Sequence, residues 1–252
     1  MAGHSKWANI KHRKGAQDAR RSKIFTRIIK ELTIASRDGG PDPETNPALR
    51  LAIQNAKGAN MPKDTMERAI KKGQGDDSGN LQSMTFEGYG PNGIAMFVET
   101  TTDNQNRTVA SVRSIFNKFD GNLGTNGSLS FIFDAKGVFT IKKEELGERN
   151  LDEFEMELID GGLEVMERLD DKVVLYTSFE DFGKMQSKLE EMKIETENAE
   201  IQRVPKITNA LPLDQAQTIL KMIDKFEEDD DVNTVYHDME LTDELVAELE
   251  KE

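Results

Sequence analysis

The amino-acid sequence predicts an α+β protein of three domains, in which a small helical domain precedes two domains that combine helices with a sheet. Two observations lead to this prediction. Apolar residues recur with a helical period up to about residue 75 and with a period closer to two beyond it. The chain has 252 residues, and a domain commonly takes about 150, so there is length for more than one core.

Three helices are expected in the first domain, residues 1–76. The first runs from residue 16 to the glycines at 39 and 40, with one apolar face made of Phe25, Ile28, Ile29, Leu32 and Ala35. The second begins with Asn46 as its N-cap and Pro47 at its first position. It turns Leu49, Ala52, Ile53 and Ala56 inward. The third runs from about residue 63 to 72 and ends at Gly73, before a linker rich in Gly and Asp.

Strands dominate the pattern beyond the linker. Strands are expected at 85–89 and 94–101 around a Gly-Pro-Asn-Gly turn, followed by a helix at 104–119 and a strand at 128–133. A complete cycle follows: strand 137–142, helix 150–160, strands 163–169 and 172–177, helix 179–192 and strand 197–204. This βαββαβ order is that of the ferredoxin-like fold. A helix at 213–227 and a strand at 232–239 complete the prediction.

The unpaired pieces on either side of the βαββαβ cycle predict an insertion. A lone strand at 232–239 would lack a sheet unless it joins the strand at 94–101. We therefore expect both sheet domains to be of ferredoxin-like type, with the third domain, 135–205, inserted in the second, 80–134 plus 206–252. The alternative is two consecutive domains followed by a helical tail.

The charge is divided unevenly along the chain. The formal net charge is −14 (33 Lys and Arg against 47 Asp and Glu). Residues 1–75 carry 16 − 7 = +9, so residues 76–252 carry 17 − 40 = −23. A basic end on an acidic chain is typical of a protein that binds a polyanion such as nucleic acid. The alternative is a basic face that packs against the protein's own acidic part.

The N-terminal arm and the first helix contain the candidate nucleic-acid-binding residues. Lys23, Arg27 and Lys30 share one face of the helix, opposite its apolar face, and are expected to face solvent and contact phosphates. Trp7 can stack on an unpaired base, or alternatively anchor the arm to the helices. The full set is Lys6, Trp7, Lys11, His12, Arg13, Lys14, Arg20, Lys23, Arg27 and Lys30.

Catalytic, metal and cofactor chemistry is not expected. The chain has no Cys and only three His, and it contains no phosphate-binding loop, nucleophile elbow or zinc-protease pair. Gly88 to Gly93 matches a dinucleotide-binding spacing, but a strand follows it where that motif requires a helix. The polar junction Asp103 to Thr108 is interpreted as a helix cap, with a phosphate-binding or domain-contact surface as the alternative. No membrane span or signal peptide is expected, which favours the cytoplasm.

Five sequence segments resemble the YebC/PmpR family. They are MAGHSKWANIKHRK at 1–14, NPALRLAI at 46–53, ANMPK at 59–63, EGYGP at 87–91 and TDNQNRT at 102–108. The resemblance covers the whole chain, and it departs from the family's usual paired glycines at Asp120-Gly121-Asn122. It implies a cytoplasmic bacterial protein of three domains without known enzymatic activity.

The resemblance also implies the function that we expect. Family members are described as DNA-binding transcriptional regulators, so the chain is expected to be a non-enzymatic regulator of gene expression that binds promoter DNA. The alternative is a translation factor that binds ribosomal or transfer RNA on the ribosome and relieves stalling, for example at proline runs. The sequence shows no helix-turn-helix dimer that would read base edges, which favours structured RNA. No membrane partner is expected, and a monomer is favoured although the oligomeric state is left open.

Overall fold

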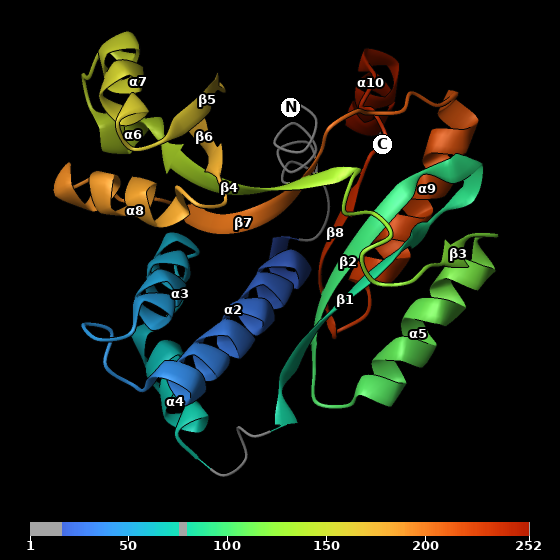
Figure 1. Cartoon of the computed structure of the whole chain (residues 1–252), viewed down its shortest axis with the longest axis horizontal. Coiled ribbons are helices and arrows are strands. Elements are labelled where there is room, and N and C mark those ends of the chain that lie inside the picture. Colours follow the sequence, from blue (N-terminus) through green and yellow to red (C-terminus); the bar gives the residue numbers. More distant parts are fainter. Residues whose placement is uncertain (1–16, 76–79, 252) are drawn as a thin grey trace. The chain divides into compact units, whose positions relative to one another are not determined.

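The computed structural model describes residues 17–75 and 80–251 (Figure 1). The chain divides into two compact units. Within the described residues, the first contains 17–23, 80–134 and 203–251, and the second contains 24–75 and 135–202. The helical segment expected as a separate domain therefore groups with the segment expected as an insertion, which the sequence did not predict.

The sheet of the first unit has the strand order β3-β1-β2-β8. Its strands are β1 (Gln82–Tyr89), β2 (Ala95–Thr102), β3 (Asn122–Leu123) and β8 (Val232–His237). β8 pairs antiparallel with β2, with Val98 opposite Val235, so the strand near the C-terminus joins the sheet that begins at residue 82. This pairing is the one that the insertion requires.

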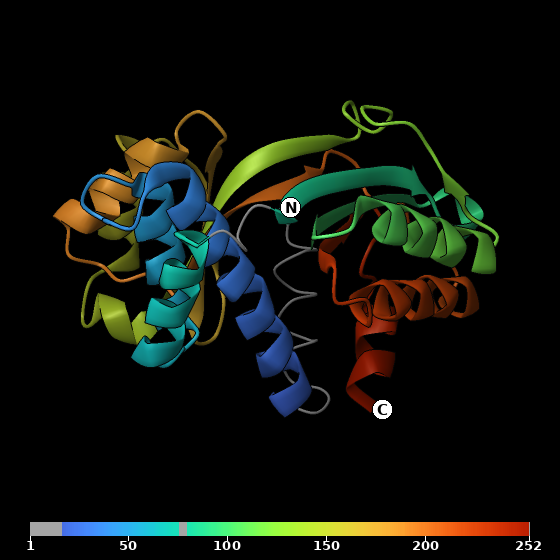
Figure 2. The same cartoon turned by 90° about the horizontal axis from the view of Figure 1, so that it is seen from below.

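Two helices cover one face of this sheet. Figure 2 shows α5 (Gln105–Lys118) and α9 (Leu213–Glu227) on the same side of β1 and β2. Their core contains fully buried Met96, Val98, Phe116, Ile219 and Phe226. A smaller apolar cluster on the other face contains Ala95, Phe97, Leu129, Phe133 and Tyr236. A turn at η2 (Pro91–Gly93) separates β1 from β2, and α10 (Asp243–Lys251) completes the unit.

The sheet of the second unit has the order β5-β6-β4-β7. In chain order the elements are β4 (Phe133–Lys142), α6 (Lys143–Leu146), α7 (Leu151–Ile159), β5 (Leu163–Arg168), β6 (Lys172–Ser178), α8 (Phe182–Glu191) and β7 (Asn198–Pro205). This is the ferredoxin-like order, with the first and last strands of the cycle adjacent. Phe139, Phe154, Leu175, Met185 and Leu189 are buried between the sheet and its helices.

Three helices contribute to the second unit: α2 (Gln17–Gly39), of which residues 24–39 belong to it, α3 (Pro47–Gly58) and α4 (Lys63–Gly73). α3 begins as predicted, because the Asn46 side chain accepts a hydrogen bond from the backbone N of Leu49 at 3.0 Å. The three helices share a core of buried Ile28, Leu32, Leu49, Ala52, Ala56, Met61 and Ala69. Phe25, Ile29, Ala35 and Ile53 pack against it while partly buried.

One predicted strand is wrong. Residues 126–132 form turns, and β4 begins at Phe133. The segment 128–133 is rich in apolar residues, as a strand often is, but the Glu87 carboxylate accepts hydrogen bonds from the backbone N of Gly127 at 2.7 Å and of Leu129 at 2.6 Å. These bonds hold the backbone in turns. The short elements β3 and α6 and the helix α10 were not predicted, and α8 begins three residues later than expected.

Candidate nucleic-acid interface

The predicted arm lies outside the described residues, and the predicted helix face is less open than expected. Lys6, Trp7, Lys11, His12, Arg13 and Lys14 belong to that arm, and of Arg20 the structure describes only the backbone, in α2. Lys23, Arg27 and Lys30 are half-buried. Lys23 groups with the first unit, where its Nζ donates to the backbone oxygen of Asp229 at 3.3 Å. The expectation that these three side chains face open solvent is wrong.

Arg27 shows why the expectation fails. Its Nε donates to Glu31 Oε1 at 2.9 Å, one turn along α2. Its Nη2 donates to the carboxylate of Glu200 on β7, 173 residues away in the sequence. The Arg27 side chain is 24% exposed and that of Glu200 only 19%. This part of the basic face therefore neutralises an acidic residue of the same unit, as the alternative interpretation of the charge asymmetry anticipated.

The guanidinium of Arg27 acts to lower the pKa of both carboxylates, but the net shifts of the two pKa values differ in direction. Burial acts to raise the pKa of Glu200, but the charge of Arg27 and the hydrogen bonds from Arg27 and Gln202 outweigh it, so the pKa is lowered. At Glu31 burial prevails over Arg27, and the nearby negative charge of Glu200 adds to it, so the pKa is raised. Arg27 is thus engaged within its own unit, because its guanidinium stabilises the ionised form of both Glu31 and Glu200.

Two polar side chains of α3 attach the helices to β7 and to the residues just before it. The buried Asn55 side chain donates to the backbone oxygen of Ala199 and accepts from its backbone N, each at 2.9 Å. Gln54 Nε2 donates to Thr196 Oγ1 at 2.6 Å. The sequence analysis missed both, although an amide on the inward side of α3, between Ala52 and Ala56, is a signal of a buried polar contact. Because these contacts occupy one face of α3, that face cannot enter a groove of nucleic acid.

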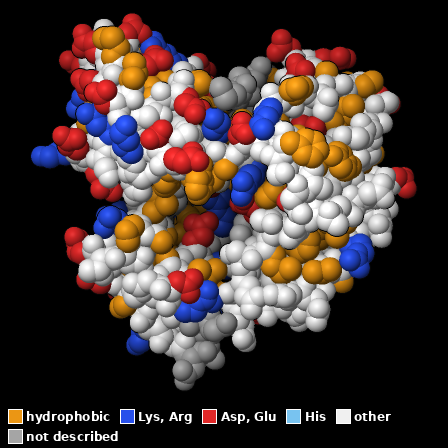
Figure 3. Space-filling view, in the orientation of Figure 1, with side chains coloured by type: hydrophobic (Ala, Val, Ile, Leu, Met, Phe, Trp, Pro, Cys, Tyr) orange, Lys and Arg blue, Asp and Glu red, His pale blue; other side chains and the backbone are white. Residues whose placement is uncertain are grey.

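Exposed Lys and Arg side chains lie on α3 and α4 of the helical segment. We define the α4 basic surface as Lys57, Lys63, Arg68, Lys71 and Lys72, all of which are exposed. Arg68, Lys71 and Lys72 lie three and four residues apart and therefore share one side of α4. Arg68 Nε donates to the backbone oxygen of Asp64 at 3.0 Å, which fixes its guanidinium near the helix. On the face drawn in Figure 3, basic and acidic side chains are otherwise interspersed.

The structural explanation for the α4 basic surface is the helix dipole. Lys57 lies in the last turn of α3, and Lys71 and Lys72 lie in the last turn of α4. A cation there stabilises the helix by about 0.3 to 1 kcal/mol. Stabilisation by the helix dipole does not require the cations to cluster on one side of α4. It also leaves the ammonium groups able to contact a phosphate.

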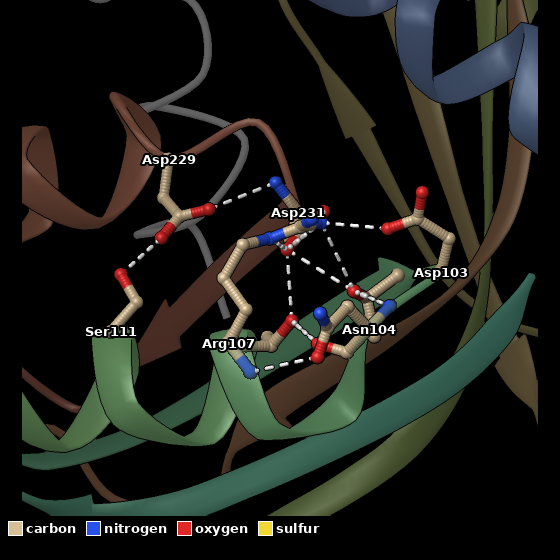
Figure 4. Close-up of polar contacts among 8 residues, drawn as sticks. Asp103, Asn104, Arg107, Ser111, Asp229 and Asp231 are labelled. Atoms are coloured by element: carbon tan, nitrogen blue, oxygen red, sulfur yellow. Dashed lines mark hydrogen bonds and ion pairs between the residues drawn. The ribbon is translucent and has the colours of Figure 1, made fainter.

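The polar junction at the start of α5 is occupied by an internal network (Figure 4). Asn104 caps the helix by accepting from the backbone N of Arg107 at 3.1 Å. Arg107 Nη2 lies 2.8 Å from Asp103 Oδ1 and 2.8 Å from Asp231 Oδ2. The same Asp231 oxygen accepts from Thr108 Oγ1 at 2.8 Å. Ser111 donates in turn to the carboxylate of Asp229.

This network favours a structural role for the junction. Burial acts to raise the pKa of Asp231, but the hydrogen bonds from Arg107 and Thr108 outweigh it, so the pKa is lowered. Asp231 therefore carries a charge at neutral pH that offsets Arg107. A guanidinium that already has two carboxylate partners is a poor phosphate receptor, so the capping interpretation holds over the phosphate-binding one.

Other kinds of site were sought in the same residues. Within the described ranges, no three His, Asp or Glu side chains are grouped so that they could hold a metal ion. None of the helices in those ranges is both long and apolar enough to cross a membrane.

Two family models match almost the whole chain. Residues 5–76 match the TACO1/YebC protein N-terminal domain, and residues 81–239 match the TACO1/YebC second and third domain. The boundary between them falls in the predicted linker.

Individual relatives match over the same length. A probable transcriptional regulatory protein of Idiomarina loihiensis is 45% identical over 251 residues, which is 99% of this chain and 100% of the relative. One of Syntrophotalea carbinolica is 48% identical over 99% of both chains. Probable transcriptional regulatory protein YebC of Salmonella arizonae is 45% identical over 99% of this chain and 100% of its own. The crystal structure of a conserved hypothetical protein from Aquifex aeolicus has a TM-score of 0.82 and 38% identity, covering 94% of this chain and 97% of that one.

Proposed function

The chain belongs to the TACO1/YebC family, and from this membership we propose that it is a non-enzymatic regulator of gene expression that binds nucleic acid. Relatives at about 45% identity over their full length bear the name probable transcriptional regulatory protein. The proposed activity is therefore DNA binding in transcriptional control. The observation that supports it here is the α4 basic surface, which lies exposed on a chain with a net charge of −14.

Phosphate contact explains the location of these cations. Lys and Arg that meet phosphates release condensed counterions, and this release supplies most of the non-specific affinity for nucleic acid. On a protein with a negative net charge the contact must be local, because the average field repels a polyanion. A cluster on one side of one helix meets this requirement.

A second candidate is a translation factor that binds ribosomal or transfer RNA. One observation favours it: α3 is attached to β7 and to the residues just before it through Asn55 and Gln54, so the helical segment does not present two free helices in the manner of a helix-turn-helix. Recognition would then depend on the shape and phosphates of the nucleic acid more than on base edges. Structured RNA meets that description better than an operator sequence does.

The first experiment measures the salt dependence of binding. Three phosphate contacts contribute roughly 2 to 3 to the slope of log K against log salt, at about 0.9 each on duplex DNA and 0.7 on single strands. The triple variant R68Q/K71Q/K72Q should lose this much of the slope. Lys184, Lys193 and Lys221 are also exposed, and the variant K184Q/K193Q/K221Q removes the same charge elsewhere. It serves as the matched control and should keep the wild-type slope.

The second experiment separates the two candidate partners. Crosslinking in growing cells, followed by sequencing of both DNA and RNA, should give discrete promoter peaks for a transcriptional regulator. Enrichment of ribosomal or transfer RNA would instead support the translation factor. Equal slopes for the two triple variants would refute the role of the α4 basic surface, whichever nucleic acid is recovered.

A further inference from the structure

A loop in the first unit is held in a fixed conformation by a buried carboxylate. We call residues 121–132 the Glu87 loop. The Glu87 side chain is buried on β1 and accepts hydrogen bonds from the backbone N of Gly127 at 2.7 Å and of Leu129 at 2.6 Å. The backbone oxygen of Glu87 accepts a third from Gly124 at 2.7 Å. A buried polar side chain is stable only when it is hydrogen-bonded. Two of the three hydrogen bonds go to the side chain of Glu87 and the third to its backbone oxygen, and together they hold the loop.

The loop also has an apolar anchor. Leu129 is fully buried in the cluster with Phe97, Phe133 and Tyr236. Ser130 Oγ donates to the backbone oxygen of Gly127 at 2.9 Å, which closes the turn. The loop conformation is therefore set before any partner arrives, as binding sites require.

This rigid loop exposes an aromatic ring. Phe131 is 67% exposed, whereas Leu129 and Phe133 on either side of it are buried. The neighbouring segment, whose Lys206 N donates to the backbone oxygen of Ile132 at 2.9 Å, exposes Ile207 at 76%. An exposed aromatic side chain on a loop that is otherwise tightly held indicates a contact surface.

The charge and size of this surface indicate the partner. Residues 121–133 include no Asp, Glu, Lys or Arg, in a part of the chain with a net charge of −23. Asp134, the next residue, lies 3.3 Å from Lys206 as an ion pair. The segment therefore does not repel a polyanion. Asn126 and Ser130 are exposed beside Phe131 and offer hydrogen-bond donors and acceptors.

A protein partner would need a larger apolar area. Of the large apolar side chains in the described part of the first unit, only Tyr89, Phe131 and Ile207 are exposed. A stable protein interface buries about 800 Å² on each partner, which one ring and one aliphatic side chain do not provide. One ring is enough to stack on one base, and neighbouring polar groups can then contact the base edge.

We propose that the Glu87 loop binds an unpaired nucleobase, which stacks on Phe131. This inference rests on the proposed function and makes it more specific, because stacking of this kind needs a single-stranded segment such as an RNA loop or end. Phosphate contacts at the α4 basic surface and base contact at the Glu87 loop are independent properties that can be removed separately.

The test compares the full-length protein with Phe131 variants. The ligands are a fluorescently labelled 12-nucleotide single-stranded RNA and the blunt duplex of the same sequence. F131A should weaken binding of the single strand about five- to 150-fold, the range for loss of one base–aromatic stack. Duplex binding and the salt slope should stay at wild-type values, because no ionic contact is removed. F131Y should retain the affinity of the wild type.

Further variants identify the kind of contact. F131L keeps an apolar side chain without a ring, so it should lose affinity nearly as F131A does. If F131L binds like the wild type, the contact is merely apolar and the stacking proposal is wrong. Unfolding midpoints in urea that match the wild type would show that the exposed substitutions leave the fold intact.

The outcome also separates this inference from the proposed function. If the wild type binds neither of these ligands nor duplex DNA, the proposed function fails and this inference fails with it. If it binds duplex DNA but not the single-stranded RNA, only this inference is overturned. If the wild type binds and R68Q/K71Q/K72Q weakens binding, while F131A binds the single strand like the wild type, only this inference is overturned.

Discussion

Replacing Arg27 by Gln should destabilise the second unit, although the residue lies on the polar face of an amphipathic helix. The guanidinium lies between two carboxylates, Glu31 at 2.9 Å and Glu200 on β7. Gln at this position removes the positive charge that pairs with both of them. The two carboxylates would then repel each other, and Glu200, at 19% exposure, has little access to water.

The expected magnitude lies between the two limits for ion pairs. Removing one partner of a fully buried pair costs roughly 3 to 5 kcal/mol, whereas an exposed pair contributes about 0 to 1 kcal/mol. The side chains of Arg27 and Glu200 are about a quarter and a fifth exposed, so solvent screens the pair only in part. We therefore expect R27Q to lower the free energy of unfolding by about 2 kcal/mol.

A double-mutant cycle measures this interaction. Urea unfolding of R27M, E200L and the double variant is followed by circular dichroism. The double variant should be more stable than either single variant, because it leaves no uncompensated charge at this pair. Arg113 is exposed on α5, so R113Q provides the control and should change stability by no more than about 0.5 kcal/mol.

A small effect would refute this reasoning. If R27Q changes stability as little as R113Q does, Glu31 and Glu200 are well solvated and do not need the guanidinium. Arg27 would then be available for a phosphate, as the sequence alone predicted. The same variant should therefore also be titrated with nucleic acid, where the present interpretation expects an unchanged salt slope.

Three further predictions concern buried polar contacts. The pKa of Asp231 is lowered in the folded protein, so the ionised side chain stabilises the fold. This contribution to the free energy of unfolding is complete above the pKa of the unfolded state, about 3.9, and is lost as the pH falls through the pKa of the folded state. D231N should therefore cost about 1 to 3 kcal/mol at pH 7 and show a shallower loss of stability below pH ~4 in acid titrations followed by circular dichroism. E87Q places an NH₂ group against one of the two backbone donors, the N–H of Gly127 or of Leu129, so it should cost about 1 to 3 kcal/mol and accelerate hydrogen exchange in this loop. N55A leaves two buried backbone groups of β7 without partners and should cost about 2 kcal/mol in urea unfolding, and a stability equal to the wild type would show that water replaces the amide.

The helices could be predicted because their signals are local. Asn46 is an N-cap in the structure as predicted, and the junction 103–108 caps α5 through Asn104, one of its two candidate residues; each side chain accepts from a backbone N three residues ahead. The order of elements from 133 to 205 and the pairing of β8 with β2 also follow the prediction. These features depend on periodicity, caps and turn residues that lie within a few positions of one another.

The failed strand at 128–133 shows the limit of local patterns. Residues 128–133 read Ser-Leu-Ser-Phe-Ile-Phe, an apolar-rich run of the kind that forms a strand. A carboxylate about 40 residues earlier, on Glu87, captures the backbone donors instead. Because this one side chain accepts from two backbone donors of the segment, the turn prevails over a strand.

The sequence by itself determined the class of the fold, the segregation of basic charge into the first 75 residues and the family to which the chain is similar, because composition and local spacing are properties of the chain. Only the tertiary structure decided which cations are used internally. Arg27 and Glu200 are 173 residues apart, and Arg107 and Asp231 are 124 apart. Ion pairs form between side chains that are neighbours in space, and no local pattern reports such neighbours. We therefore propose phosphate contacts at Arg68, Lys71 and Lys72 of α4 in place of those expected at Lys23, Arg27 and Lys30.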